Sequence, residues 1–208
     1  MYGETKQIQI VLNTPIGPLT EARRHRIVEF LGPEYVPQPT PLPNSMLLVN
    51  HAHRKTVFVA EAQLNATHDG ESLQFDSANW LHSLSGLREA LLLDDRFPAM
   101  VQIVAHVEAD GSATEQSVHC FAPLPEDDMR ARFDGLRGVG LRINFERPPY
   151  ICDLNVEPYF QNATRYFLKL SASGQAPVSL ELLVEDVAQF HRVVNDDAVR
   201  FLEATLVD

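Results

Sequence analysis

Three turn-forming dipeptides, set between segments of alternating apolar and polar residues, place the strongest constraint on the fold of this chain. They are Asp69-Gly70, Asp110-Gly111 and Pro148-Pro149. Residues of these types favour the tight turns that join antiparallel strands. Because the flanking segments alternate, their apolar side chains fall on one face. The sequence therefore predicts antiparallel hairpins, each with one apolar face.

Each turn determines which residues would face one another across its hairpin. The predicted pairs are Leu64–Phe75 and Ala66–Leu73 around the first turn, Val101–Cys120, Ile103–Val118, Gln102–His119 and His106–Glu115 around the second, and Leu141–Val156, Ile143–Leu154 and Phe145–Cys152 around the third. In all three hairpins the apolar residues share a face. This register predicts that Cys120 is buried, where a thiol is usually inert.

Several segments have the periodicity of helices instead. One follows the N-cap candidate Thr20 and ends at Gly32, and a short one opens at Pro125. The longer ones span residues 78–93 and 184–202. The predicted apolar stripe of the last helix consists of Val187, Phe190, Val194, Ala198 and Phe201. We expect this helix to dock on the sheet and close the core.

The order of these elements predicts the fold class. Hairpins and helices do not follow the strand-helix-strand rhythm of a parallel sheet, and we find no internal sequence repeat. We expect an α+β fold, in which helices pack on one face of an antiparallel sheet. Residues 1–208 are predicted to form one domain, with a division into two lobes near residues 122–136 as the alternative. The proline-rich residues 33–43 are expected to be an extended tether outside the strand pairing.

Charge and composition exclude several classes of function. The formal net charge is -11, from 17 Lys and Arg against 28 Asp and Glu, which opposes nucleic-acid binding. No apolar run is long enough to span a membrane, and no signal peptide is visible, so we expect a cytoplasmic protein. The excess of Arg over Lys is typical of a bacterial chain. We expect a protein partner or a small-molecule ligand, and the sequence leaves the oligomeric state open.

His51 and His53 are the first candidate site. On a strand, histidines two residues apart point the same way and can bind a metal ion. However, the polar segment 50–55 separates two apolar segments, which favours a solvent-exposed hairpin turn. We therefore expect no metal site there.

The other candidates are Asp153, Glu157 and His191. If Cys152 faces the core, Asp153 and Glu157 share the opposite face of a strand about 13 Å apart, which exceeds the separation of paired catalytic carboxylates. We therefore expect an exposed strand face matched to arginines such as Arg142, with ligand binding by Asp153 and Glu157 as the alternative. His191 follows Phe190 at the border of an apolar stripe, where a packed histidine is more common than a catalytic one. No cofactor-binding motif is present, so we expect no cofactor.

Two hypotheses of function follow. The first is a non-enzymatic binding or protein-interaction module, including an inhibitor or immunity-like protein whose acidic surface meets a basic partner. The alternative is a metal-dependent or acid-base enzyme that uses His51 and His53.

Five segments also carry a resemblance to a known family. They are "FLGPEYVPQP" (30–39), "FDSANWLHSL" (75–84), "GVGLRINF" (138–145), "YICDLNVEPYF" (150–160) and "VAQFHRVVNDDAVRFLE" (187–203). Their order resembles a sporadically distributed family of bacterial proteins of uncharacterised function. The resemblance implies an α+β fold and nothing about chemistry.

Overall fold

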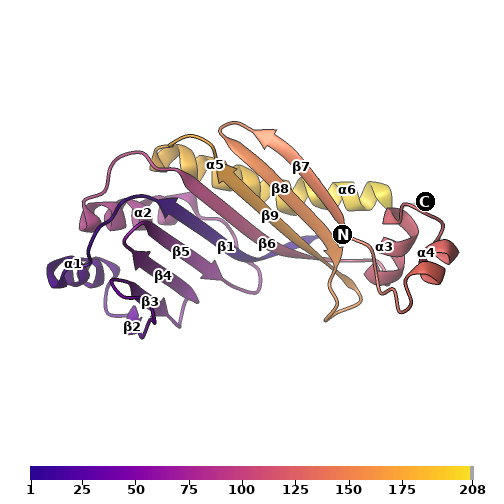
Figure 1. Ribbon diagram of the computed structural model, residues 1–208, viewed down its shortest axis with the longest axis horizontal. Helices are drawn as coiled ribbons and strands as arrows, with labels where there is room; N and C mark the ends of the chain where they lie inside the picture. Colours follow the sequence, from indigo (N-terminus) through magenta and orange to yellow (C-terminus); the bar gives the residue numbers. More distant parts are fainter. Residues whose placement is uncertain (207–208) are drawn as a thin grey trace.

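A computed structural model describes residues 1–206 of the chain and shows a single nine-stranded sheet with helices packed against one face (Figure 1). The strands are Gly3–Asn13 (β1), Val36–Gln38 (β2), Met46–Asn50 (β3), Lys55–Ala60 (β4), Gln63–Asp69 (β5), Ala99–Glu108 (β6), Leu141–Arg147 (β7), Tyr150–Pro158 (β8) and Arg165–Gly174 (β9). The helices are Glu21–Leu31 (α1), Ser77–Leu91 (α2), Ala113–Phe121 (α3), Glu126–Arg132 (α4), Leu180–Arg192 (α5) and Ala198–Thr205 (α6), with a π-helical turn, Val193–Asp197 (η1), between α5 and α6.

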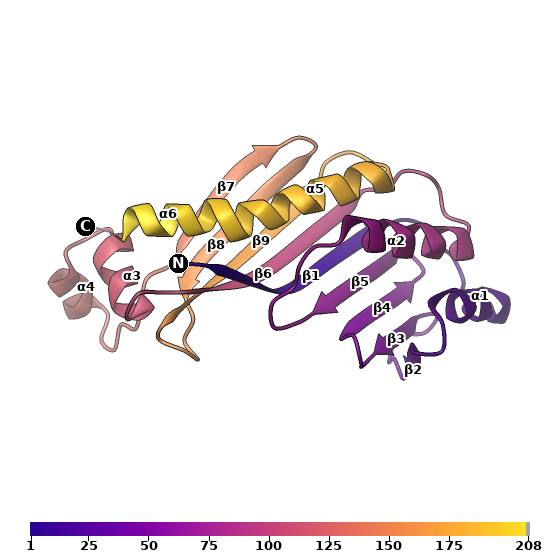
Figure 2. The same ribbon diagram turned by 180° about the vertical axis from the view of Figure 1, so that it is seen from behind.

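The sheet is antiparallel throughout, with the strand order β2-β3-β4-β5-β1-β6-β9-β8-β7. Helices α1, α2, α5 and α6 cover one face, which lies toward the viewer in Figure 2. We call this the covered face and the other the uncovered face. The predicted α+β class, with an antiparallel sheet and a long C-terminal helix, is confirmed.

The two halves of the chain repeat one topology. Each half begins with a long strand, continues with one or two helices and a run of antiparallel strands, and ends with a helix on the covered face. The first half runs from β1 to α2 and the second from β6 to α5. The first strands of the halves, β1 and β6, pair at the centre of the sheet. Outward from them β5 matches β9, β4 matches β8 and β3 matches β7, whereas β2 has no counterpart beyond β7. The sequence pattern did not reveal this repeat, because the two halves share an order of elements rather than a residue period.

The core lies between the sheet and the covering helices. Alternate residues of the central strands are fully buried there, among them Ile8, Ile10 and Ile103. Trp80 and Leu84 of α2 and Phe190 of α5 pack onto the same cluster. Because strand residues alternate between faces, burial of this set leaves the intervening polar residues on the uncovered face.

The third predicted hairpin is confirmed with its register. Leu141 pairs with Val156, Ile143 with Leu154 and Phe145 with Cys152, around a turn at Pro148-Pro149. The hairpin connection predicted at residues 50–55 is also confirmed, with the turn itself at 51–54 between the paired residues Asn50 and Lys55. The first helix is confirmed too, and the Thr20 side chain accepts a hydrogen bond from the Arg23 backbone N–H.

The other two predicted hairpins are wrong. After Asp110-Gly111 the chain forms α3, because Ser112 caps its N-terminus by accepting a hydrogen bond from the Glu115 backbone N–H (3.2 Å). The strand before this turn, β6, pairs with β1 and β9 instead. After Asp69-Gly70 there is no strand, since β5 pairs with β4 and β1 and residues 70–76 lead into α2.

Consequently, the residue pairs predicted across these two turns do not form. His119 lies on α3, not on a strand opposite Gln102. Glu115 lies on α3 as well, not opposite His106. Val118 is buried as predicted, whereas Cys120 is only half-buried.

Two further expectations need correction. The proline-rich segment is not entirely outside the sheet, because Val36–Gln38 pairs with β3 as an edge strand. Pro37 is tolerated there, since an edge strand needs hydrogen bonds on one side only. At the end of the C-terminal helix, Phe201 was predicted to be buried but is 37% exposed, and its neighbour Leu202 is buried instead.

Among the described residues, no helix combines the length and the apolar character needed to cross a lipid bilayer.

Candidate functional site: the uncovered face of the sheet

The centre of the uncovered face is a row of polar side chains on β5, β1 and β6. We call Gln7, Gln9, Asn65 and Gln102 the amide ladder. Gln9 Nε2 donates to Asn65 Oδ1 (3.2 Å), Gln102 Nε2 donates to Gln7 Oε1 (3.2 Å) and Gln7 Nε2 donates to Asp69 Oδ1 (2.8 Å). These half-buried amides retain further donors and acceptors, since each amide group offers two of each.

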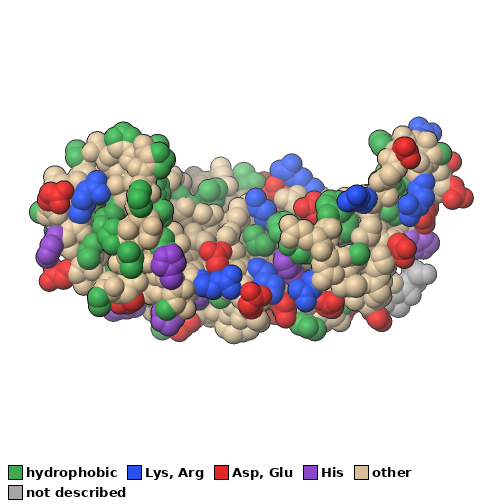
Figure 3. Space-filling model, turned by 90° about the horizontal axis from the view of Figure 1, so that it is seen from below, with side chains coloured by type: hydrophobic (Ala, Val, Ile, Leu, Met, Phe, Trp, Pro, Cys, Tyr) green, Lys and Arg blue, Asp and Glu red, His purple; other side chains and the backbone are tan. Residues whose placement is uncertain are grey.

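The two ends of this face differ in character. At the β2 end the side chains are mainly apolar: Val36, Leu47, Val49 and Phe58. At the β7 end they are mainly charged: Arg142, Glu146, Asp153, Glu157 and Lys169. Figure 3 shows the molecule from below with the uncovered face along its upper profile, where hydrophobic side chains gather at the left end and a hollow separates this end from the right end, where Figure 1 places α3 and α4. A partner that matches both ends of this face would therefore bind in one orientation.

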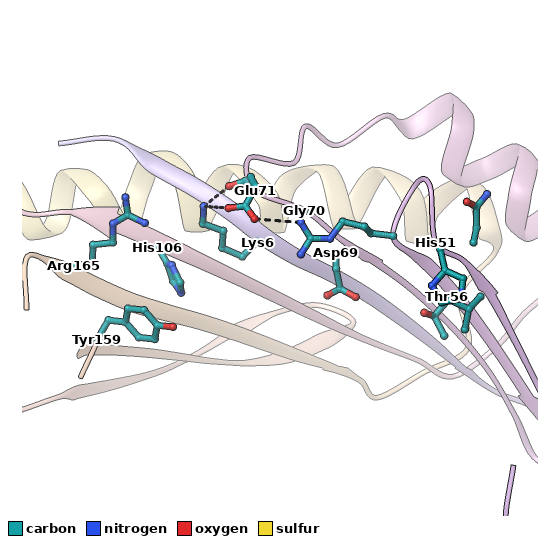
Figure 4. A pocket seen from close by; sticks show the side chains of 12 residues that line it. Lys6, His51, Thr56, Asp69, Gly70, Glu71, His106, Tyr159 and Arg165 are labelled. Carbon is teal, nitrogen blue, oxygen red and sulfur yellow. Dashed lines mark hydrogen bonds and ion pairs between the residues drawn. The ribbon is translucent and has the colours of Figure 1, made fainter. Parts of the chain in front are cut away.

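A groove of about 570 Å³ lies along one margin of the face. It is formed where the β3–β4 turn, the end of β5, the start of β1 and the ends of β6 and β9 meet (Figure 4). Its charged and aromatic lining is Lys6, His51, Arg54, Asp69, Glu71, His106, Tyr159 and Arg165. Segments from both halves of the chain thus contribute to one depression.

The charges in this groove pair with one another. Glu71 lies between Lys6 (3.8 Å) and Arg54 (3.2 Å), and Arg165 Nε binds Glu108 (2.6 Å). The hydrogen bond from Arg54 and the positive charge of Lys6 lower the pKa of the Glu71 carboxyl. The Arg54–Glu71 pair is exposed, and an exposed ion pair contributes little to stability, so these two side chains can exchange partners at small cost when another charged molecule approaches. Lys6 and Arg165 are partly buried and are held more firmly.

His106 forms one wall of the groove. Its ring packs against Tyr159 (4.4 Å between centroids) and Phe167 (6.1 Å). Burial, together with the positive charges of Lys6 and Arg165, lowers the pKa of His106. The ring is therefore neutral at neutral pH, when it can donate one hydrogen bond and accept another.

His51 and His53 are both exposed in the β3–β4 turn, as the sequence indicated, and they face different depressions. His51 lines the groove, whereas His53 borders a second depression with Lys55 and His82 on the helix side. Within residues 1–206, no three His, Cys, Asp or Glu side chains lie close enough to hold a metal ion.

Asp153 and Glu157 lie on the uncovered face of β8, two residues to either side of Asn155. Arg142 faces Asn155 across the β7–β8 pair and forms an ion pair with Asp153 (2.5 Å). Glu157 is exposed near the end of the strand. The arrangement matches the expected strand face with arginine partners, and the structure does not bring the two carboxyl groups together.

His191 lies on the opposite side of the sheet, on α5. Its Nε2 is 3.1 Å from Thr5 Oγ1 and 3.3 Å from the Leu73 carbonyl oxygen, and Asn195 Nδ2 donates to Thr5 Oγ1 (2.8 Å). Thr5 is only 2% exposed, so its hydroxyl is held within the structure by these two contacts. This histidine joins β1, α5 and the loop before α2, and it borders a depression of about 520 Å³ on the helix side.

Sequence reasoning missed the amide ladder and the groove. The alternation in "KQIQIVLN" marks Gln7 and Gln9 as one polar face, but their neighbours across β5 and β6, Asn65 and Gln102, lie far away in the chain. The pattern Ser112-x-x-Glu115 is a capping signal that would have identified α3.

Comparisons with known proteins add little. No family model matches the chain, and no curated protein matches it. Among solved structures, the chain is similar to "Methanococcus jannaschii TBP", with a TM-score of 0.41 and 10% sequence identity over 81% of this chain and 87% of that chain. A likeness at this level carries no argument about function.

Proposed function

We propose that this protein is a non-enzymatic binding module that receives a protein partner on the uncovered face of its sheet. The observation that carries the proposal is the uncovered face itself, which runs across the sheet while α1, α2, α5 and α6 all pack on the other side. Its hollow profile and its mixture of amides, apolar groups and paired charges are typical of a protein-binding surface.

The charge of the chain favours a basic partner. With a net charge of -11, long-range attraction would speed the approach of a positively charged protein and slow that of a nucleic acid. The cationic groups of the groove, Lys6, Arg54 and Arg165, each pair with a carboxylate. An acidic inhibitor or immunity-like protein is the specific form of this proposal.

A paired substitution tests the proposal. Gln9→Arg adds a bulky charge at the centre of the uncovered face, and Leu182→Arg adds the same charge to the exposed side of α5 as the control. The native protein and both variants, each checked for folding by circular dichroism, are used to capture partners from extract of the source cells, with and without nuclease treatment. A captured protein is then purified and its affinity measured by calorimetry.

We expect one partner that binds the native protein and the Leu182→Arg variant and loses at least about tenfold in affinity for Gln9→Arg, because a charge buried without a partner opposes association. Equal binding by Gln9→Arg would show that the uncovered face is not the binding surface. Capture that disappears after nuclease treatment would count against a protein partner.

A further inference from the structure

Strand β7 forms an edge of the sheet, and nothing in residues 1–206 lies beyond it (Figures 1 and 2). Its counterpart in the first half, β3, is flanked by β2, and the core-facing residues of β3 are buried: Met46 7%, Leu48 0% and Asn50 2% exposed. The core-facing residues of β7 are only half-buried: Leu141, Ile143 and Phe145. The second half of the sheet thus has no strand equivalent to β2, which covers the edge of β3 in the first half.

The backbone of β7 offers hydrogen-bonding groups on this edge. Gln175 N donates to the Pro149 carbonyl oxygen (2.8 Å), so Pro149 and every second residue after it along β8 direct their backbone toward β9. The intervening residues of β8 face β7 and engage Phe145 and Ile143, with which they pair. By the same alternation, Arg142, Asn144 and Glu146 direct their N–H and C=O groups outward.

The side chains of β7 are complementary to a second copy of the same strand. If two β7 strands pair antiparallel about a two-fold axis at Asn144, Arg142 faces Glu146 of the other copy, and Ile143 faces Phe145. Arg142, Asn144 and Glu146 are all exposed, and in the described part of the chain Glu146 forms no ion pair. Opposite charges that face each other across strands stabilise the pair.

The two edges of the sheet differ in their protection. The β2 edge carries Pro37 within the strand and Pro39 directly after it, and proline blocks the addition of another strand. Strand β7 has no proline, and its pairing with β8 is regular over seven residue pairs. On the uncovered face its two charges, Arg142 and Glu146, have opposite signs and face each other when the strand meets itself.

From these observations we infer that the protein forms a homodimer through antiparallel pairing of β7 with β7 of a second copy, centred on Asn144. The dimer has one continuous sheet, with both uncovered faces on the same side. It covers the exposed flanks of Ile143 and Phe145. This inference does not depend on the partner proposed above, because the interface is the edge of the sheet and not its face.

A charge exchange tests the dimer. Glu146→Arg places an arginine opposite Arg142 of the other copy, and Arg142→Glu places a glutamate opposite Glu146. In a mixture of the two variants, each interface position again carries opposite charges. Glu157→Arg, on the same face but on β8, is the matched control. The measurement is the molar mass by sedimentation equilibrium over a concentration series at low salt, with circular dichroism and thermal unfolding as checks of folding.

We expect the full chain and Glu157→Arg to dimerise equally. Each single variant should raise the dissociation constant at least about tenfold, because two attractive pairs become repulsive. Mixing the folded variants should restore a one-to-one dimer. A native chain that remains monomeric at every concentration would overturn the inference. So would single variants that dimerise as well as the native chain, or a mixture of folded variants that gains no dimer.

Discussion

At the scale of single residues, two buried polar atoms beneath the sheet stand out. Tyr150 Oη and Asp186 Oδ2 are buried, and within residues 1–206 neither has a hydrogen-bond partner. Burial raises the pKa of the Asp186 carboxyl above its ordinary value, because a charged carboxylate loses its hydration there. The ionised form of Asp186 therefore costs stability at neutral pH.

We predict that Asp186→Asn increases the free energy of unfolding at pH 7 by less than about 1 kcal/mol, because the Asp186 side chain is only partly buried and Tyr150 and Arg147 offset part of the desolvation. The pKa of Asp186 is higher in the folded state than in the unfolded state, so the cost is present above the folded-state pKa and declines as the pH falls through it. The advantage of the variant should therefore shrink on acidification. Urea unfolding from pH 7 down to pH 4 measures this, and a pH-independent difference would contradict the assigned cause.

Gly86 is a second residue with a specific packing role. A Cβ atom at this position would lie 1.9 Å from Cζ of Phe30, so the absence of a side chain lets α1 approach α2. We predict that Gly86→Ala lowers the free energy of unfolding by about 1–2 kcal/mol, since the Phe30 ring must move.

In a Phe30→Ala background the same change should instead stabilise by about 1 kcal/mol, because alanine has the higher helix propensity. A double-mutant cycle by chemical denaturation compares the two values. The same sign in both backgrounds would show that Phe30 is not the obstacle.

At the scale of elements, the C-terminal helix shows how one local irregularity changes which residues are buried. The stripe Val187, Phe190, Val194 and Ala198 is buried as the sequence predicted. The π-helical turn η1 has more residues per turn than an α-helix, so it rotates everything after it relative to the preceding stripe. Leu202 consequently replaces Phe201 on the core side.

We predict that Leu202→Ala lowers the free energy of unfolding by about 2–4 kcal/mol, as expected for a fully buried leucine. The matched change Phe201→Ala, one residue earlier and 37% exposed, should cost less than about 1 kcal/mol. Thermal and urea unfolding of both variants measures the difference. A larger cost at Phe201 would mean that the helix continues without the π-helical turn.

At the scale of the whole molecule, the two halves meet at β1 and β6. These strands pair over nine residue pairs, and residues on both sides of the seam, such as Ile8 and Ile103, are fully buried. His191 also joins the halves, because it reaches from α5 to Thr5 and Leu73. A core shared in this way should unfold as one unit.

We predict a single calorimetric transition in which the calorimetric and van't Hoff enthalpies agree. Ile103→Ala should shift the whole transition, at a cost of about 2–4 kcal/mol, because it leaves a cavity at the seam. Val104→Ala, on the uncovered face of the same strand, is the control and should have a small effect. Two separate transitions, or a shift of only part of the signal, would indicate independent halves.

The site was less predictable than the fold. Periodicity identified α1, α2, the C-terminal helix and the β7–β8 register, all of which depend on residues close together in the chain. The groove could not be predicted, because His51, His106 and Arg165 come from three separate segments. The prediction of a hairpin at Asp110-Gly111 was wrong because the same dipeptide can precede either a hairpin strand or a capped helix, and here it precedes α3.

The sequence alone determined the fold class, the sidedness of most elements and the acidic charge, because these depend on local periodicity and composition. Only the tertiary structure decided which strands are neighbours, that the two halves repeat one topology, and that β7 lacks the outer strand that flanks β3. The physical reason is that the alternation of a strand specifies which of its faces is buried, whereas its hydrogen-bonding edges are identical backbone groups in every sequence. The choice of neighbour is made by the packing of the whole core.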